Sequence, residues 1–200
     1  MKFELLTAPH FAAFTTREFA TDAEVAIATA TRQLGAAADR GALVRITRGV
    51  WANPKHPDFH PLVCVPKILG GEQGYVSFLT ALHLHGVISQ IPRTIQVATT
   101  GHARRLDTAV GTYELFQLAP KLMRDGVEWS QTRAPYRLAS AEKALVDTLY
   151  VARHRGARFR SLPEVELRGL SRRRALQLAA LAEDPRVTRA VAQRWAELAA

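Results

Sequence analysis

The sequence predicts an α+β protein in which a small helical unit closed by a β-hairpin precedes a mixed α/β domain that ends in helices. Three observations predict this order. Helix-start patterns cluster near residue 15, two short apolar runs meet at a glycine turn near residue 49, and a proline-rich stretch then precedes alternating helix and strand patterns. We therefore expect an N-terminal domain over 1–53, a linker over 54–61 and a C-terminal domain over 62–200.

The composition is that of a folded protein. With 48% hydrophobic residues in 200, the chain can bury a core, which excludes wholesale disorder. Its single cysteine, Cys64, fits a reducing compartment and is expected to be a small buried hydrophobe. The start of the chain lacks the long apolar core of a signal peptide, and the longest stretch without charges is too polar to span a membrane. We expect a soluble, cytoplasmic protein without a membrane partner.

The net charge of +9, carried largely by 22 arginines, predicts a polyanionic partner, with nucleic acid favoured over membrane. The excess is unevenly distributed. Residues 1–66 hold seven bases and six acids, whereas residues 67–200 hold twenty and twelve. Any contact with nucleic acid must accommodate that asymmetry.

The residues around Thr15 predict the start of a helix. Thr15 is a candidate N-cap, and Glu18 follows at the spacing of a capping box. Phe14 and Phe19 occupy the two positions of a hydrophobic staple.

The same start pattern recurs six residues later, with Thr21 as N-cap and Glu24 at the third helical position. Two starts so close together predict a first helix of little more than one turn, a bend, and a second helix over about 22–40. Gly41 is placed to take the left-handed conformation that ends this helix. The arrangement is a helix-turn-helix.

The second helix has two distinct faces. Its expected apolar face comprises Ile27, Ala30, Leu34 and Ala38. The opposite face carries small and hydrogen-bonding side chains: Val25, Thr29, Arg32, Gln33, Ala36 and Arg40. Such a face suits a helix that enters the major groove of DNA, and it equally suits an ordinary solvated helix.

The segment GALVRITRGVWANP, residues 41–54, predicts a hairpin. Gly49 supplies the positive φ that the last position of a three-residue loop requires. The inward-facing positions are Val44, Ile46, Val50 and Ala52, and the outer side or tip holds Arg45, Arg48 and Trp51. Helix, bend, helix and arginine-tipped hairpin is the order of a winged helix, in which the hairpin reaches phosphates or a narrow minor groove. An ordinary hairpin with a solvated tip stays open as the alternative.

The larger remainder reads as alternating helices and strands. We expect helices over 62–69 and 77–85, separated by a glycine-rich turn. Strands are expected within 91–100, 110–118 and 134–139, in a sheet of about four. Ser140 is expected to cap a helix over 141–154, and two or three short helices should fill 162–200.

The C-terminal domain offers little for catalysis. His83 and His85 lie about 200° apart on a helix, so they cannot share one metal ion. Lys143 and Asp147 are expected to form a surface pair, and no third acid or base accompanies Glu164 and Glu166. We therefore predict no catalytic residue, no cofactor and no bound metal.

A basic cluster runs over residues 153–174, from the end of the helix predicted over 141–154 into the helical tail. Only Glu164 and Glu166 offset its eight bases: Arg153, Arg155, Arg158, Arg160, Arg168, Arg172, Arg173 and Arg174. The cluster predicts a surface for nucleic acid or for an acidic protein. Its alternative is a solvated helix end favoured by the helix dipole.

Five strings resemble AbiEi-type antitoxins of type IV toxin–antitoxin systems from bacteria and archaea. They are FTTREFA, GALVRITRGVWANP, YVSFLTALHLHG followed by QIP, IQVATT, and SAEKALVDTLY, and together they cover about residues 14–167. The resemblance implies an N-terminal winged helix that binds repeats in double-stranded DNA of its own promoter and represses it. It also implies a C-terminal domain that neutralises a nucleotidyltransferase-like toxin and supports cooperative binding, with oligomerisation on the DNA.

By position, the resemblance implies that Thr29, Arg32 and Gln33 read bases. It implies that the DNA backbone is held by Thr16, Arg17, Arg45 and Arg48. Two other functions stay open. The near-neutral N-terminal part allows a protein-binding module that uses the winged helix as a scaffold, and a nuclease would have to use Glu114, Glu164 or Glu166.

Overall fold

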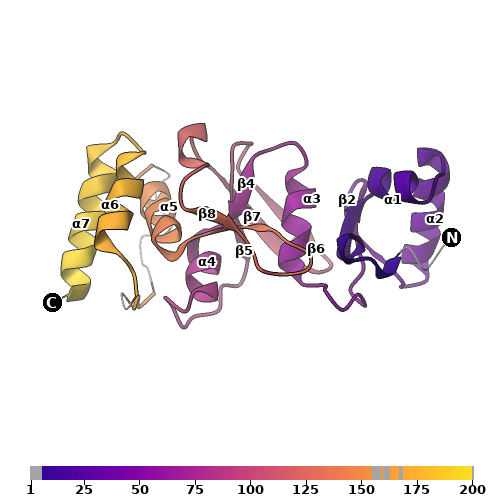
Figure 1. Cartoon of the computed structure of the whole chain (residues 1–200), viewed down its shortest axis with the longest axis horizontal. Coiled ribbons are helices and arrows are strands. Elements are labelled where there is room, and N and C mark those ends of the chain that lie inside the picture. The colour runs from indigo at the N-terminus through magenta and orange to yellow at the C-terminus, as the bar shows by residue number, and fades with distance from the viewer. Residues whose placement is uncertain (1–5, 155–158, 160–162, 167–168, 200) are drawn as a thin grey trace. The chain divides into compact units, whose positions relative to one another are not determined.

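The computed structural model describes residues 6–154, 159, 163–166 and 169–199. Over these residues the chain is an α+β protein with seven α-helices and two β-sheets, which confirms the predicted class. Figure 1 shows the elements along the chain. They divide into an N-terminal unit (residues 1–71, 106–112 and 130–136) and a C-terminal unit (72–105, 113–129 and 137–200). No helix in the described ranges is long and apolar enough to cross a membrane.

The N-terminal unit is built on a three-stranded antiparallel sheet with the order β1-β3-β2. Two helices are inserted between the first two strands in sequence, and a short 3₁₀ turn, η2 (Pro9–Ala12), precedes them. The elements are β1 (Ala13–Thr15), α1 (Thr16–Asp22), α2 (Ile27–Asp39), β2 (Val44–Thr47) and β3 (Val50–Ala52). The hairpin strand β3 therefore lies between its partner β2 and the strand that precedes the helices.

The predicted start of α1 is confirmed. The backbone N–H of Glu18 donates to Oγ1 of Thr15 at 3.1 Å, and the N–H of Thr15 donates to the Glu18 carboxylate at 2.7 Å. Phe14 and Phe19 are fully buried with ring centroids 6.3 Å apart, as a hydrophobic staple requires.

The second predicted helix start is wrong. Thr21 lies inside α1, and Glu24 adopts a left-handed conformation with φ 56°. The N–H of Glu24 donates to the carbonyl of Thr21 at 3.1 Å, and that of Val25 donates to the carbonyl of Ala20 at 3.0 Å. These two bonds form a Schellman motif, so the residues taken as a new N-terminus instead close the C-terminus of α1. The helix α2 begins only at Ile27, without a side-chain cap.

The far end of α2 follows the prediction more closely. Gly41 has φ 67° just after the helix, as expected of the residue that ends it. The buried face comprises Ala30, Leu34 and Ala37. The prediction that Ile27 faces inward is wrong, because its side chain is 50% exposed. Ile27 is the first residue of α2 and lies about one turn before Ala30, the first core residue of the helix.

The hairpin also departs from the prediction in two details. Thr47 pairs with Val50, so the turn has two residues and not three, although Gly49 does take a positive φ of 76°. Trp51 was expected on the outer side and is only 4% exposed. The reason is the third strand: Trp51 pairs with Phe14 of β1, and its indole N–H donates to Oγ1 of Thr16 at 2.8 Å.

The remaining part of residues 1–71 is also packed. The turn η3 (Pro61–Cys64) runs into α3 (Val65–Leu69), which confirms the helix predicted over 62–69, and Cys64 is fully buried as expected. The segment 54–61, expected as a linker, carries a buried His56 whose Nε2 lies 3.0 Å from the carbonyl of Thr7. That segment therefore belongs to the N-terminal unit.

The second sheet has six strands in the order β6-β7-β5-β4-β9-β8. The β4–β5 and β8–β9 pairs are antiparallel, and the β5–β7 and β4–β9 pairs are parallel. The strands are β4 (Gly74–Val76), β5 (Ile95–Thr99), β6 (Arg104–Thr108), β7 (Gly111–Gln117), β8 (Val127–Trp129) and β9 (Arg137–Ala139). Three of them match the predicted strands. The strands β4 and β8 were missed because they have only three residues each, and β6 because its residues are mostly polar.

Four helices complete the C-terminal unit, with a 3₁₀ turn, η4 (Pro120–Leu122), between β7 and β8. The helices are α4 (Phe78–Leu84), α5 (Ala141–His154), α6 (Arg172–Ala180) and α7 (Pro185–Ala199). The N–H of Lys143 donates to Oγ of Ser140 at 3.2 Å, which confirms the predicted cap of α5. In Figure 1, α5, α6 and α7 pack together near the end of the chain, as their contacts require.

Candidate nucleic-acid interface

A groove of about 410 Å³ separates α2 from the β2–β3 hairpin within the N-terminal unit. The helix and the hairpin supply opposite walls, and two buried side chains supply the floor. The α2 wall comprises Ile27, Thr31 and Gly35, the hairpin wall Arg45, Arg48 and Gly49, and the floor Thr16 and Trp51. The groove therefore joins one side of a helix to the arginine-bearing tip of a hairpin.

The two hairpin arginines are exposed, as predicted. The Arg45 guanidinium lies 5.9 Å from the centre of the Trp51 ring, and its Nε donates to the carbonyl of Thr47 at 3.4 Å. For Arg48, the described part of the chain provides no hydrogen bond or ion pair. Because guanidinium stays charged at any physiological pH, both side chains present positive charge at the mouth of the groove.

The predicted DNA-backbone contacts divide into two groups. Arg45 and Arg48 line the groove together, whereas Arg17 is exposed on α1 outside it. Thr16 is only 8% exposed and its Oγ1 accepts the indole N–H of Trp51, so it supports the groove from below. A phosphate contact requires a more open hydroxyl than this one.

The predicted base-reading residues lie away from the hairpin. Thr29 and Gln33 are half-buried on the other flank of α2, and Arg32 is exposed between that flank and the groove. The α2 residues on the groove wall, Ile27 and Thr31 among them, were missed because the sequence does not reveal which flank of the helix the hairpin approaches. Their one detectable pattern is the i, i+4, i+8 spacing that ends at Gly35, a glycine inside a helix.

An ion pair supports the helix start beneath this site. Lys67 of α3 binds the carboxylate of Glu18, which also accepts the N–H of Thr15 in the capping box. Partial burial acts to raise the pKa of Glu18, but the hydrogen bonds from Lys67 and Thr15 outweigh it and hold that pKa below its ordinary value. Ionised Glu18 therefore stabilises the fold.

Acid should weaken this contribution. Because the folded pKa of Glu18 lies below its ordinary value of 4.5, the contribution is present above about pH 4.5 and is lost as pH falls through the folded pKa. We expect Lys67→Met to unfold more readily than wild type at pH 6, with the difference shrinking below pH 4. Thermal unfolding at several pH values measures this, with the exposed Lys55→Met as a matched control. A difference that stays constant from pH 6 to pH 3 would contradict it.

The basic cluster is described only in part. Arg153, at the end of α5, and Arg172, Arg173 and Arg174, in the first turn of α6, are exposed. The other members, Arg155, Arg158, Arg160 and Arg168, lie outside the described residues. Of the four described arginines, the dipole explanation fits only Arg153, because a helix N-terminus such as that of α6 disfavours positive charge.

Of the groups considered for catalysis or metal binding, His83, His85 and Glu114 make contacts within the fold, whereas Glu164 and Glu166 are exposed. Nε2 of His85 lies 2.7 Å from the carbonyl of Ala139, and Nδ1 of His83 lies 3.4 Å from that of Ile88. Buried Glu114 accepts a hydrogen bond from Thr94 at 3.1 Å. Within the described ranges, no three His, Cys, Asp or Glu side chains are placed to hold a metal ion.

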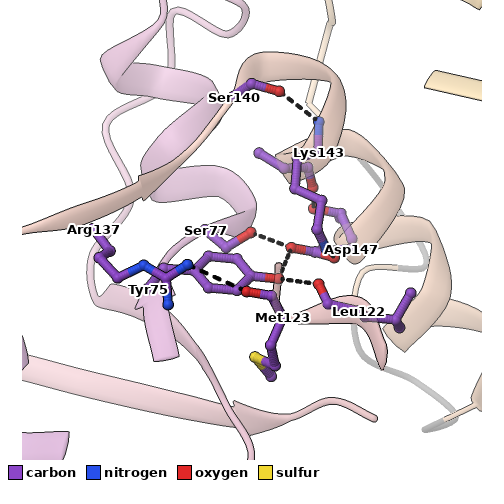
Figure 2. Close-up of polar contacts among 10 residues, drawn as sticks. Tyr75, Ser77, Leu122, Met123, Arg137, Ser140, Lys143 and Asp147 are labelled. Atoms are coloured by element: carbon purple, nitrogen blue, oxygen red, sulfur yellow. Dashed lines mark hydrogen bonds and ion pairs between the residues drawn. The ribbon is translucent and has the colours of Figure 1, made fainter. Parts of the chain in front are cut away.

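The prediction of a surface pair between Lys143 and Asp147 is wrong, because both side chains are buried and bind each other in the interior. Figure 2 shows that Asp147 also accepts hydrogen bonds from two hydroxyl groups, one on a strand of the sheet and one at the start of α4. Tyr75 donates to Oδ2 of Asp147 at 3.0 Å, and Ser77 donates to the same oxygen at 2.7 Å. Burial, followed by the negative charge of Asp147, raises the pKa of Tyr75 well above 10. The i,i+4 spacing alone could not distinguish a buried face of α5 from an exposed one.

No protein-family model matches this sequence, and no curated protein matches it significantly. The resemblance to AbiEi-type antitoxins therefore rests on its short strings. The groove between α2 and the hairpin is the feature from which a function can be argued.

Proposed function

We propose that the protein is a DNA-binding transcriptional repressor whose N-terminal unit is a winged helix-turn-helix. The chain order β1, α1, α2, β2, β3 with the sheet order β1-β3-β2 supports the winged-helix assignment. The observation that carries the proposal is the groove that α2 shares with Arg45 and Arg48. In a winged helix, these two elements meet the same duplex.

The dimensions and charges are compatible with this role. The 13 residues of α2 make a helix about 20 Å long, and a helix fits a major groove about 12 Å wide. From the hairpin, guanidinium groups would reach phosphates or an adjacent minor groove. Residues 1–66 are nearly neutral, so the bases of residues 67–200 would supply much of the long-range attraction to DNA.

We further propose that this cytoplasmic repressor is the antitoxin of a toxin–antitoxin pair and counteracts a nucleotidyltransferase-like toxin. The five strings that resemble AbiEi-type antitoxins support this. The exposed Arg172, Arg173 and Arg174 give the C-terminal unit a surface for DNA or for an acidic partner. The proposal assigns no catalytic residue.

A mobility-shift titration on the DNA upstream of the protein's own gene tests the repressor. Replacing Arg48 with alanine should lower affinity about equally for all sequences and reduce the slope of log K against log salt by about one unit, because one phosphate contact is lost. Arg133→Ala removes an exposed guanidinium of the same unit that does not line the groove, and it should leave the slope unchanged. No shift at low salt, or a shift indifferent to both sequence and Arg48→Ala, would exclude this function.

The near-neutral charge of residues 1–66 favours one alternative, a protein-binding module in which the winged helix is only a scaffold. Purification from the native cell separates the two functions. A stoichiometric acidic partner together with an absence of DNA affinity would favour the scaffold.

A further inference from the structure

Ile27 is the one large hydrophobic side chain of the N-terminal unit that is exposed, among the residues the structure describes. It is half exposed at the first position of α2 and lines the groove opposite the hairpin arginines. Covering exposed apolar surface of this kind with another apolar group is favourable, because it removes that surface from water. A partner that binds the groove should therefore carry an apolar group at this point.

Gly35 lies two turns further along the same wall. It is in the interior of α2, where alanine would stabilise the helix, and its φ is not in the left-handed region. A Cβ at this position would meet no atom within 4 Å, so packing within the protein does not require glycine. A physical reason for glycine at position 35 is that it lets an outside molecule come close to the helix backbone.

Thr31 lies between these two residues. Its hydroxyl donates to the carbonyl of Ile27 at 2.8 Å, so the oxygen retains only lone pairs for a ligand. A ligand at this point must donate a hydrogen bond. In the major groove, the amino groups of adenine and cytosine are such donors.

The wall of α2 thus presents an apolar group, a hydrogen-bond acceptor and an open gap, facing Arg45 and Arg48. On the base edges of the major groove, the 5-methyl group of thymine is the apolar feature, and the first residues of a recognition helix are those that reach the bases. We infer that Ile27 packs against a thymine methyl group while Gly35 admits the DNA strand. This rests on the proposed DNA-binding function and assigns base reading to the flank of α2 opposite Thr29 and Gln33.

A double-mutant cycle between protein and DNA tests the role of Ile27. The DNA upstream of the gene is amplified with either thymidine or deoxyuridine triphosphate, which differ by the methyl group, and is titrated with wild type and with Ile27→Ala. Wild type should bind the uracil duplex about fourfold more weakly for each methyl group lost from the contact. Ile27→Ala should bind both duplexes equally, at about the affinity of wild type for the uracil duplex.

Matched variants separate this contact from general effects. Thr29→Ala, on the other flank of α2, should keep the full ratio between the thymine and uracil duplexes. Gly35→Ala should raise the melting temperature of the free protein, because alanine favours the helix and its Cβ clashes with nothing inside the protein. It should lower the DNA affinity about tenfold or more, because the same Cβ overpacks the contact with DNA. If glycine were needed at this position only for the fold, Gly35→Ala would lower both the melting temperature and the DNA affinity.

The outcomes distinguish the two proposals. If wild type and Ile27→Ala show the same thymine-to-uracil ratio while both bind DNA, the role of Ile27 is overturned and the repressor stands. If neither duplex is bound at low salt by wild type, the repressor is overturned as well. Because Ile27 is half exposed, its alanine variant should retain the wild-type melting temperature, and Ile27→Val should keep part of the ratio.

Discussion

Replacing Asp147 with asparagine should destabilise the protein by about 3–5 kcal/mol, the cost of leaving one member of a buried ion pair without its partner. Lys143 is buried and binds Asp147, and its Nζ lies 5.2 Å from the centre of the Tyr75 ring. The amide would still accept hydrogen bonds from the hydroxyl groups of Tyr75 and Ser77 but could not neutralise the ammonium group. Urea denaturation followed by circular dichroism measures the loss.

Two further variants make this result specific. Glu183→Gln makes the same chemical change in the exposed pair that Glu183 forms with Lys121, and should leave the stability nearly unchanged because solvent screens that pair. The double variant Lys143→Met, Asp147→Leu should recover about half or more of the loss, because it removes both charges. Equal effects of Asp147→Asn and Glu183→Gln would show that the interior pair is not what holds this region.

The second large effect should come from Trp51→Ala, at about 3–5 kcal/mol. The indole is packed in the core of the N-terminal unit, and its N–H satisfies Oγ1 of Thr16 at 2.8 Å. Truncation leaves a cavity beneath the groove and removes that donor. Trp51→Phe keeps much of the packing and should cost less, about 1–3 kcal/mol for the lost hydrogen bond.

Trp129 provides a control with the same residue type. It is 59% exposed, so Trp129→Ala should cost less than about 1 kcal/mol in the same denaturation experiment. If the two alanine variants are equally stable, Trp51 does not support the hairpin as described. A loss confined to Trp51→Ala would link the stability of the N-terminal unit to the floor of its groove.

Local chemistry made several elements predictable. Thr15 and Glu18 fix the start of α1 because their hydrogen bonds lie within four residues of chain, and Gly41 and Gly49 take positive φ where a helix and a hairpin end. Thr21 and Glu24 misled because the capping-box spacing is also compatible with the end of a helix, and a Schellman motif forms there instead.

What the sequence could not supply was the identity of distant neighbours. Trp51 is buried because β1 lies beside it, and Lys143 and Asp147 are buried because β4 and α4 bring Tyr75 and Ser77 to them. The sequence identified the hairpin arginines of the groove, but it did not identify the residues of α2 that form the opposite wall. Periodicity locates the buried stripe of α2, whereas the flank nearer the hairpin depends on the path of the chain after Gly41.

The first turn of α6 carries three consecutive arginines at the positive end of its peptide dipoles, and its own sequence supplies no acid there. Glu142 of α5 provides one carboxylate, which accepts the N–H of Ser171 at 3.0 Å. This end of the helix is consequently under electrostatic repulsion when the protein is alone, and an anion that settles on it would relieve that repulsion. Added salt should have two opposite effects on the first turn of α6. Screening stabilises the helix in the free protein, and it also weakens the attraction between the arginines and any bound polyanion.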